Sequence, residues 1–553
     1  MSARLSAIMK LLDSPAVQPG LDLSLVPSLD DGAATHVVLA TNGTTHPLHL
    51  GRVVVRTDLV VTEFVEHGYQ SWSTVRPTIP SDYRSVRAQA PRWFRNQMLA
   101  DGESAGRALC ADTVLIHSGG LVATTWLDGP PLTMLVNLDG GVAISMDLDG
   151  ILLDPGQARH VARLRSVEGP AGPLLSEWAA LTGIEADART RSDPPFGWCS
   201  WYQYFTEVTA DDVVANLRLA AEHELGLVQI DDGWQRSIGE WSGTSERFGM
   251  PIGDLADHIR QQGLSAGIWT APFLAVEGSP LATANPSWLV TNEAGRPRTA
   301  LHHGGWGGRV YALDLSQASV IEHLAAQFTD LAEMGFDYFK IDFLHAGMVP
   351  GQRRGSDGRT RTEYFTDALS AIRGAIGDTA YLLGCGSPLA PAVGLVDGMR
   401  LSEDVAPHWG PGDHFPGWSE SSVGTANAIE ASVRRAPLHR RWYAGDPDCV
   451  LLRPSDTDLT DTERHSLVAT VAGTGGFTVL SDDLRRYGAA EWDLVEALRA
   501  AQPVVDEAVD LVDPLATSHL ELIGPAHHLV VDLDRRTASV EGPDIPALLT
   551  RHP

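Results

Sequence analysis

Two aspartates at the ends of strand-like runs are the residues whose types and spacing best fit a chemical step. Asp342 ends a short apolar run, with Lys340 two positions before it, and Asp404 ends another, with Arg400 four positions before it. Alternate residues of an extended strand share a face, so Lys340 and Asp342 point the same way. Arg400 and Asp404 do so too if their run, 398–404, is extended throughout. Two carboxylates accompanied by cations indicate cleavage of a glycosidic bond.

A single Lys-x-Asp is more often a solvated strand end, so the interpretation depends on how many similar ends surround it. Short apolar runs that stop in polar, Gly or Trp residues recur through the middle of the chain at 196–201, 225–232, 265–273, 338–343, 381–388, 398–404, 442–448 and 477–483. Apolar residues spaced by three and four between them, at 213–222, 321–334 and 364–376, indicate helices. Eight strand-then-helix units over about 290 residues predict a (β/α)8 barrel of the TIM type, whose active site lies at the carboxyl ends of the strands.

The flanks of this region differ from it. Residues 21–164 contain β-branched and aliphatic runs with Gly and Asp turns and little helical period, which predicts an antiparallel β-sandwich. A helix at 491–501 precedes a tail with two short strand-like runs, at 519–523 and 529–532. We therefore expect an α/β protein of three domains: an N-terminal β-sandwich with a linker helix at 1–185, a catalytic barrel at 186–490 and a small C-terminal β-domain at 491–553.

Composition limits the partners. The 553 residues are too many for one core, and the formal net charge of -29 disfavours nucleic acid and anionic membrane surfaces. A neutral small-molecule substrate fits better. The four cysteines are few for this length and are expected to be reduced. The first twenty residues show no signal-peptide core and no apolar run reaches membrane-spanning length, so a cytoplasmic enzyme is expected. No ligand cluster of metal-binding spacing is present, and we expect neither a metal nor a cofactor.

Six motifs carry a resemblance to a known family. They are Phe-Gly-Trp-Cys-Ser-Trp-Tyr at 196–202, Gln-Ile-Asp-Asp-Gly-Trp-Gln at 229–235, Gly-Ile-Trp-Thr-Ala-Pro-Phe at 267–273, Tyr-Phe-Lys-Ile-Asp-Phe at 338–343, Leu-Gly-Cys-Gly-Ser-Pro-Leu at 383–389 and Val-Asp-Gly-Met-Arg at 396–400. In order and spacing they resemble the motif series of glycoside hydrolase family 36 α-galactosidases, in particular the compact bacterial members. The resemblance covers 193–483, with a weaker echo at 68–73, and implies the same three-domain architecture.

The resemblance also implies roles for the two aspartates. Asp342 corresponds to the nucleophile and Asp404 to the general acid/base of a retaining double displacement. Such a mechanism needs the two carboxyl groups on opposite sides of the anomeric carbon, roughly 5 to 6 Å apart. Lys340 beside Asp342 favours its ionised form. Asp404 must begin protonated and later accept a proton from water.

Other residues correspond to a sugar pocket. Carboxylates accept paired hydroxyl hydrogen bonds, so Asp231 and Asp232 are expected to bind sugar hydroxyls. Adjacent strand residues face opposite ways, however, and a helix-capping role stays open unless the strand has ended before them. The remaining residues that the resemblance assigns to substrate binding are Trp72, Trp201, Tyr202, Trp269, Lys340, Cys385 and Arg400. Of these, Trp72 would reach over from the sandwich, and Cys385 is equally well explained by buried packing. Trp198 and Trp234 are assigned to the core or to the layer of residues behind the pocket wall.

The sequence departs from the family pattern next to the acid/base. Close relatives read Gly-Pro-Asp where this chain reads Ser402-Glu403-Asp404. Gln203 stands where a histidine is usual, and a loop at 410–421 rich in Gly, Pro, Trp and His is expected to line the aglycone subsites.

The expected function is therefore a retaining, exo-acting α-galactosidase that hydrolyses terminal α-galactosyl residues of galacto-oligosaccharides such as melibiose and raffinose. An α-N-acetylgalactosaminidase, an α-glucoside-acting variant and a transglycosylase remain alternatives on the same scaffold. A non-catalytic carbohydrate-binding protein and a metal-dependent barrel hydrolase are alternatives from other classes. The oligomeric state is left open.

Overall fold

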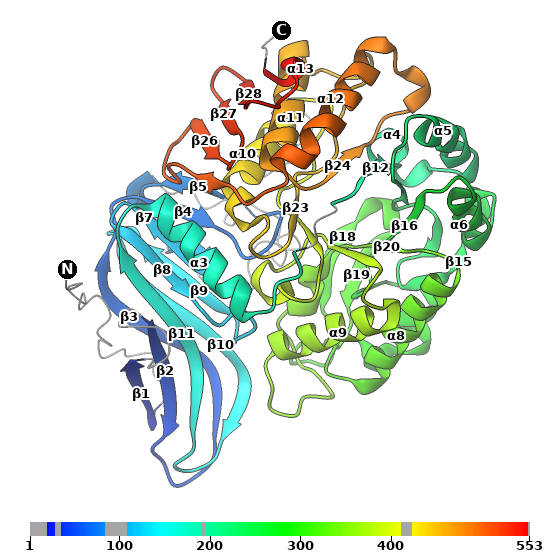
Figure 1. The fold of residues 1–553 in the computed structure, drawn as a ribbon. Helices are drawn as coiled ribbons and strands as arrows, with labels where there is room; N and C mark the ends of the chain where they lie inside the picture. Colours follow the sequence, from blue (N-terminus) through cyan, green and yellow to red (C-terminus); the bar gives the residue numbers. More distant parts are fainter. Residues whose placement is uncertain are drawn as a thin grey trace.

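The computed structural model of the protein describes residues 19–27, 35–73, 75–82, 108–190, 194–410 and 423–550. Figure 1 shows three groups of elements in chain order: a β-sandwich drawn in blue and cyan, a barrel in green and yellow, and a red sheet at the carboxyl end packed on orange helices. The predicted fold class, a (β/α)8 barrel flanked by β-domains, is confirmed.

The N-terminal domain is a curved, mostly antiparallel sheet. Its strands are β1 (Leu21–Pro27), β2 (Thr35–Asn42), β3 (Leu48–Val60), β4 (Phe64–His67), β5 (Val75–Thr78), β6 (Ala108–Asp112), β7 (Val114–His117), β8 (Gly120–Thr124), β9 (Leu132–Asn137), β10 (Gly141–Leu153) and β11 (Ala158–Glu168). The order is β1-β2-β11-β8-β7-β4-β6-β9-β10-β3, with β5 paired to β4. Inward side chains of β3 and β10 share one apolar core with those of β2 and β11, so the two halves of the sheet form a sandwich.

The barrel contains the parallel strands expected from the sequence. They are β12 (Phe196–Cys199), β13 (Leu227–Ile230), β16 (Ser265–Thr270), β20 (Tyr338–Ile341), β21 (Tyr381–Gly384), β22 (Gly398–Arg400), β23 (Ala444–Asp446) and β24 (Thr478–Leu480). Each pairs in parallel with its neighbours in the order β23-β22-β21-β20-β16-β13-β12-β24. A backbone hydrogen bond of 3.1 Å from the Phe477 N–H to the Gly445 carbonyl joins the two end strands. The strands are buried on both faces, as parallel strands covered by helices must be.

Helices cover the outside of the barrel. They are α4 (Trp201–Tyr204), α5 (Ala210–Glu222), α6 (Ile252–Gln261), α7 (Pro280–Ala284), α8 (Ala318–Glu333), α9 (Arg361–Ile376), α10 (Thr425–Arg435) and α11 (Asp461–Thr474). Three of them begin with a capping box, in which a threonine hydroxyl accepts from the third backbone N–H and an acidic side chain returns to the cap: Thr209 with Asp212, Thr360 with Glu363 and Thr460 with Glu463. The predicted helices at 213–222, 321–334 and 364–376 correspond to α5, α8 and α9.

Two small sheets are inserted at the carboxyl ends of barrel strands. The hairpin β14 (Gln235–Ser237) and β15 (Glu240–Thr244) follows β13. A second sheet of β17 (Leu274–Val276), β18 (Thr299–His303) and β19 (Gly308–Ala312) follows β16, in the order β17-β19-β18. Both lie in the loops that a TIM barrel uses to build its site.

The C-terminal region forms an antiparallel sheet of β25 (Asp510–Leu511), β26 (His519–Ile523), β27 (His528–Asp532) and β28 (Thr537–Glu541). It packs against α11 and the short helix α13 (Ala547–Thr550), and the helix α12 (Ala489–Val505) packs against both of these helices. The helix α3 (Ala171–Glu185) leads from the sandwich to the barrel. Domain boundaries at residues 185 and 490 stay a proposal, and α12 runs through the second of them. None of the helices within the described ranges combines the length and apolar character needed to cross a membrane.

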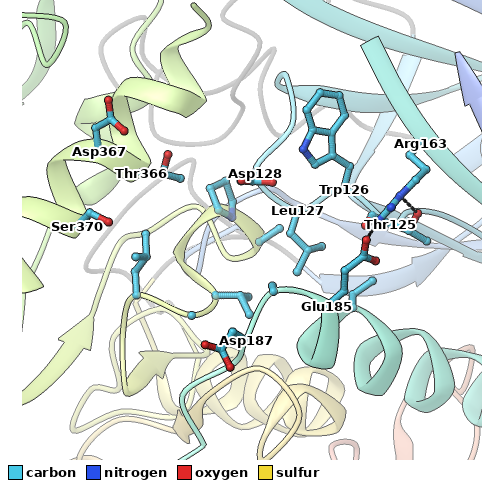
Figure 2. Close-up of a pocket in the computed structure, with 17 residues that line it drawn as sticks. Thr125, Trp126, Leu127, Asp128, Arg163, Glu185, Asp187, Thr366, Asp367 and Ser370 are labelled. Carbon is cyan, nitrogen blue, oxygen red and sulfur yellow. Dashed lines mark hydrogen bonds and ion pairs between the residues drawn. The ribbon is translucent and has the colours of Figure 1, made fainter. Parts of the chain in front are cut away.

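A cavity of about 520 Å³ lies between the sandwich, the end of α3 and the barrel helix α9. Figure 2 shows its labelled lining residues: Thr125, Trp126, Leu127, Asp128 and Arg163 of the sandwich, Glu185 and Asp187 at the end of α3, and Thr366, Asp367 and Ser370 of α9. None of the residues predicted to form the sugar pocket lines this cavity.

The sandwich is joined to the barrel by a buried arginine at the end of α10. The Arg435 guanidinium donates to the backbone carbonyls of Ser71 (2.6 Å) and Ser73 (2.7 Å) in the sandwich and of Leu401 (2.7 Å) in the barrel. The Ser71 N–H also donates to the Ser387 carbonyl at 3.0 Å. These bonds hold the loop after β4 against the carboxyl ends of β21 and β22.

We expect Arg435→Met to destabilise the protein, because three buried carbonyls would lose their donor. The expected loss is about 3 kcal/mol, which lowers the thermal midpoint by about 5 °C in a domain of this size. Calorimetry of the variant beside the parent measures it. Arg218→Met is the matched control, since the Arg218 side chain is 76% exposed. Equal midpoints for Arg435→Met and the control would contradict the role of Arg435 as a joint.

Candidate active site

Asp342 is the first residue after β20 and lies at the carboxyl end of the barrel. The Trp269 indole N–H donates to Asp342 Oδ2 at 3.0 Å, and the Phe343 backbone N–H donates to Oδ1 at 2.7 Å. Phe343 has a left-handed backbone, with φ of 55°, which turns its own N–H back toward the carboxylate. Two N–H donors therefore fix the orientation of Asp342 and complement its negative charge.

Lys340 forms its ion pair with Asp231 rather than with the aspartate next to it on the strand. Lys340 Nζ lies 2.9 Å from Asp231 Oδ2, and both side chains are buried. Burial disfavours the charged lysine, but the Asp231 carboxylate outweighs it, so the pKa of Lys340 is raised well above its usual value. Lys340, which is buried on β20 inside the barrel, therefore stays cationic.

Asp231 and Asp232 both point into the site because β13 ends at Ile230, one residue before them. Asp231 accepts from the Gln229 side chain at 2.7 Å in addition to Lys340. Asp232 accepts from Gln235 at 2.6 Å and from the Trp306 indole N–H at 2.7 Å. Burial raises the pKa of Asp232 to about 6, and the nearby Asp231 and Asp342 charges act in the same direction.

Asp404 lies four residues beyond its strand. The extended run predicted to reach Asp404 is wrong in its second half, since β22 ends at Arg400 and the chain then turns. Arg400 Nη1 nevertheless lies 3.1 Å from Asp404 Oδ1. Burial raises the pKa of Asp404, helped by the Asp342 charge and opposed by Arg400 and Lys340. The environment therefore favours the protonated acid.

Asp446 and Asp448 complete the surroundings of Arg400 and were not singled out from the sequence. Arg400 Nε lies 3.2 Å from Asp446 and Nη2 lies 2.7 Å from Asp448 Oδ1. The Tyr202 hydroxyl donates to Asp448, and the Val405 N–H donates to the same carboxylate at 2.7 Å. Burial raises the pKa of Asp448 to about 6. The Asp-x-Asp at the end of the expected strand at 442–448 was the available signal.

The other expected aromatic residues separate into rim and core. Trp201 and Tyr202 begin α4, which follows β12 after Ser200. Trp201 is half-buried, and its ring packs edge-on against Phe205, with the ring centroids 5.2 Å apart. Trp198 and Trp234 are fully buried, as predicted. Their indole N–H groups donate to backbone carbonyls, which leaves these two rings to the core.

Trp72 reaches the barrel from the sandwich. Its ring contacts Phe343 edge-on, with centroids 4.8 Å apart and an interplanar angle of 83°. It also covers Gly386, which has a φ of +51°, and a Cβ at that position would lie 2.9 Å from the Trp72 ring. The Trp72 ring therefore fits against Gly386 across the domain junction. Its two contacts in the barrel, Phe343 and Gly386, directly follow Asp342 and Cys385 in the sequence.

Cys385 follows β21 and is buried, and burial raises the pKa of its thiol well above the usual value. Cys199, Cys385 and Cys449 are free thiols, in keeping with the expected reduced state. Gln203 accepts from the Asp483 backbone N–H at 3.2 Å, so it holds a loop at the barrel rim.

Trp306 is a site residue that sequence reasoning missed. It stands at the tip of the β18–β19 hairpin, flanked by Gly304-Gly305 and Gly307-Gly308. Its ring lies 4.9 Å from Phe343 and is stacked on His303 at 4.0 Å. A tryptophan between two glycine pairs was the local signal, but its bond to Asp232 joins residues 74 positions apart.

Two further expectations concern the loop at 410–421 and metal binding. Most of the loop at 410–421 lies beyond the described residues. In the part of the chain that the structure describes, His, Cys, Asp and Glu side chains form no group of three or more that is arranged to hold a metal ion.

Comparisons with known proteins agree with the geometry. Residues 188–370 match the family model described as Melibiase. The chain is 26% identical over 284 residues to the α-galactosidase AgaA of Geobacillus stearothermophilus, covering 45% of this chain and 38% of that protein. It is 30% identical over 130 residues to α-galactosidase 2 of Pediococcus pentosaceus, covering 22% and 17%. The matched stretches thus span well under two thirds of these curated relatives.

Solved structures extend the similarity over most of the chain. The α-galactosidase TtGalA from Thermus thermophilus, in complex with p-nitrophenyl α-D-galactopyranoside, matches with a TM-score of 0.70 and 27% identity, covering 93% of this chain and 100% of that one. The crystal structure of AgaA matches in fold, with a TM-score of 0.60 and 14% identity over 90% of this chain and 70% of that one. With the barrel, the flanking β-domains and the carboxyl-end cluster of aspartates in place, the chain is similar in sequence and fold to the α-galactosidases of glycoside hydrolase family 36.

Proposed function

We propose that the protein is a retaining, exo-acting α-galactosidase that removes terminal α-galactosyl residues from galacto-oligosaccharides of the melibiose and raffinose type. The observation that carries the proposal is the contrast between two carboxyl groups at one barrel end. Asp342 is held by two N–H donors, whereas burial raises the pKa of Asp404. One group is prepared to attack and the other to donate a proton.

In the first step, Asp342 attacks the anomeric carbon while the protonated Asp404 donates its proton to the leaving oxygen. The glycosidic C–O bond breaks and a galactosyl ester forms on Asp342. Formation of the ester removes the negative charge of Asp342. Because that charge raises the pKa of Asp404, its loss lowers the pKa of Asp404 and favours the ionised carboxylate. In the second step, the ionised Asp404 accepts a proton from water, which attacks the anomeric carbon and releases galactose.

Substrate recognition is proposed for the remaining cluster. Asp231 and Asp232 would accept sugar hydroxyls, with Lys340 holding the first and Trp306 the second. Arg400 would support Asp404, and Trp201, Tyr202, Trp269, Trp72 and Cys385 would enclose the ring. A neutral oligosaccharide partner, a cytoplasmic location and the absence of a cofactor belong to the same proposal, with the free thiols as support for the location.

Other glycosides remain testable on the same scaffold. A relative from Flavonifractor plautii, named an A type blood α-D-galactosamine galactosaminidase, is 30% identical over 156 residues, 27% of this chain and 14% of that protein. A panel of nitrophenyl α-galactoside, α-N-acetylgalactosaminide and α-glucoside separates these substrates, and measuring transfer to added sugars detects transglycosylation.

Asp342→Gly should abolish turnover of nitrophenyl α-galactoside, because only Asp342 forms the ester. Added azide should restore reaction and give β-galactosyl azide, which mass spectrometry and NMR identify. Asp337→Asn, at the opposite end of the same strand, is the matched control and should keep parental activity. Activity of Asp342→Gly without azide would remove Asp342 from the mechanism.

Hydrolysis of nitrophenyl α-galactoside should exceed that of the α-glucoside by about 100-fold or more, since a site built to bind a hydroxyl rejects an analogue that misplaces it. Asp232→Asn should narrow this ratio, because an amide cannot accept at both positions. The ratio of kcat/KM values measures the effect. Comparable rates on both sugars in the parent would replace the galactoside assignment with the α-glucoside alternative.

Glu403 should affect the pH profile only on its alkaline side. Burial, assisted by the Asp404 charge, raises the pKa of Glu403 to about 8, against the opposing effect of Arg435. Below that pH Glu403 is neutral and cannot influence Asp404; above it, the new negative charge raises the pKa of Asp404 and keeps it protonated. Glu403→Gln should therefore match the parent below pH 7 and lose kcat/KM earlier above pH 8.

The measurement uses raffinose, whose poor leaving group makes proton donation matter. Profiles that coincide at every pH would show that Glu403 does not act on Asp404. A shift confined to the acidic limb would contradict the assigned direction.

A further inference from the structure

Asp404 needs an anchor that its own segment does not provide. β22 ends at Arg400, and the described residues 401–410 form neither a helix nor a strand. A group that passes a proton to a leaving oxygen must be held in place, since a displacement of about 1 Å can cost about 100-fold in rate. The contacts that fix Asp404 must therefore come from another segment of the chain.

Asp448, two residues after the end of β23, provides these contacts. Its carboxylate accepts from four donors, two on each oxygen. Arg400 Nη2 and the Cys449 backbone nitrogen each lie 2.7 Å from Oδ1. The Val405 backbone nitrogen lies 2.7 Å from Oδ2, which also accepts from the Tyr202 hydroxyl. A carboxylate has about four acceptor sites, so all of them are used within the protein.

These bonds close a ring that contains the candidate acid/base. Arg400 Nη1 lies 3.1 Å from Asp404 Oδ1, while Nη2 of the same guanidinium is held by Asp448. Val405, whose backbone N–H donates to Asp448, is the next residue after Asp404. Asp448 therefore fixes both the backbone beside Asp404 and the cation that the Asp404 side chain contacts.

The backbone of Asp448 is itself unusual. Its φ of 79° lies in the left-handed region, which residues with a side chain seldom adopt. Such a conformation persists where the surrounding contacts fix it, and it is concentrated at functional sites. The Asp448 N–H donates to Asp446 Oδ1 at 2.9 Å, and Asp446 is in turn a partner of Arg400. The turn is thus tied to the same guanidinium through two aspartates.

Asp448 lies behind the pocket wall. Its side chain has no exposed surface, whereas 33% of the Asp404 side chain is accessible. The Tyr202 hydroxyl spends its hydrogen on Asp448, which leaves its oxygen to accept from a ligand. The carboxylate of Asp448 therefore acts on the site only through the groups that it holds.

We propose that Asp448 is a positioning residue for acid/base catalysis, which holds Asp404 and Arg400 in the arrangement that proton transfer requires. The proposal rests on the α-galactosidase function proposed above. Asp448 makes none of the contacts that orient Asp342, which come from Trp269 and Phe343. The loss of Asp448 should therefore affect each substrate according to how much its leaving group needs a proton.

The test compares kcat/KM for raffinose with kcat/KM for dinitrophenyl α-galactoside, whose leaving group departs without protonation. Asp448→Asn keeps the size of the side chain but puts an amide where four donors need acceptors. It should lower kcat/KM for raffinose about 100-fold and that for the dinitrophenyl substrate less than about fivefold.

Azide provides a second readout in the same variant. It attacks the anomeric carbon of the galactosyl ester without needing a base, displaces the Asp342 carboxylate and gives α-galactosyl azide. Added azide should therefore raise kcat of Asp448→Asn on the dinitrophenyl substrate and leave that product, which NMR identifies.

Asp482→Asn is the matched control. Asp482 is also fully buried, and it accepts from the Leu452 and Arg453 backbone N–H groups and from the Tyr487 hydroxyl. The Arg453 guanidinium lies 3.0 Å from its other oxygen. These partners are distinct from those of Asp448, so Asp482→Asn should change kcat/KM for both substrates by the same factor.

Equal losses on the two substrates in Asp448→Asn, or the absence of α-galactosyl azide, would overturn the positioning role. Hydrogen exchange of the parent tests the anchor without any variant. The Val405 N–H should exchange slowly although it lies outside helices and strands, and exchange at the rate of an exposed loop amide would also overturn the role. A parent enzyme that hydrolyses neither galactoside would refute the proposed function instead.

Discussion

The balance of charge in a buried pocket is the constraint on which the site depends. Among the described residues, two cations, Lys340 and Arg400, lie among six carboxyl groups at the carboxyl end of the barrel: Asp231, Asp232, Asp342, Asp404, Asp446 and Asp448. Two positive charges cannot neutralise six negative ones where water is scarce, so protons must make up part of the difference. The pKa values of Asp232, Asp404 and Asp448 are raised accordingly.

This arrangement lets one pocket contain both an acid and a base. Lys340 is committed to Asp231, whereas the single charge of Arg400 is divided among Asp404, Asp446 and Asp448, so burial still raises the pKa of Asp404 and of Asp448. Arg400 is shared among three aspartates, and Asp404, the most exposed of the three with a third of its side chain accessible, is the one that solvent and substrate can reach. The acid is therefore defined by its position relative to Arg400 as much as by its own surroundings.

Much of the fold was predictable because its strands and helices follow from the pattern of apolar residues within short stretches of the sequence. Short apolar runs identified the barrel strands and helical spacing identified the helices between them, and the expected tail strand at 519–523 agrees with β26 to the residue. The expected strands were too long at their carboxyl ends, as at 225–232 and 398–404, because the functional residues come directly after each strand and extend its polar pattern. The residues that were missed depend on distant partners. Trp306 donates to Asp232 and Arg435 donates to Ser71, and in each pair the two residues are far apart in the sequence, so no local pattern predicts the contact.

The joint between Arg435 and the loop after β4 connects residues 364 positions apart in the chain. On the ribosome, the sandwich loop that carries Trp72 is made early, whereas its anchor Arg435 is made only after six of the eight barrel strands. The pocket therefore cannot close on a partial chain. Closure of so long a loop is a late and slow event. Activity therefore requires that the sandwich has been joined to the barrel, and a folded barrel alone is not sufficient.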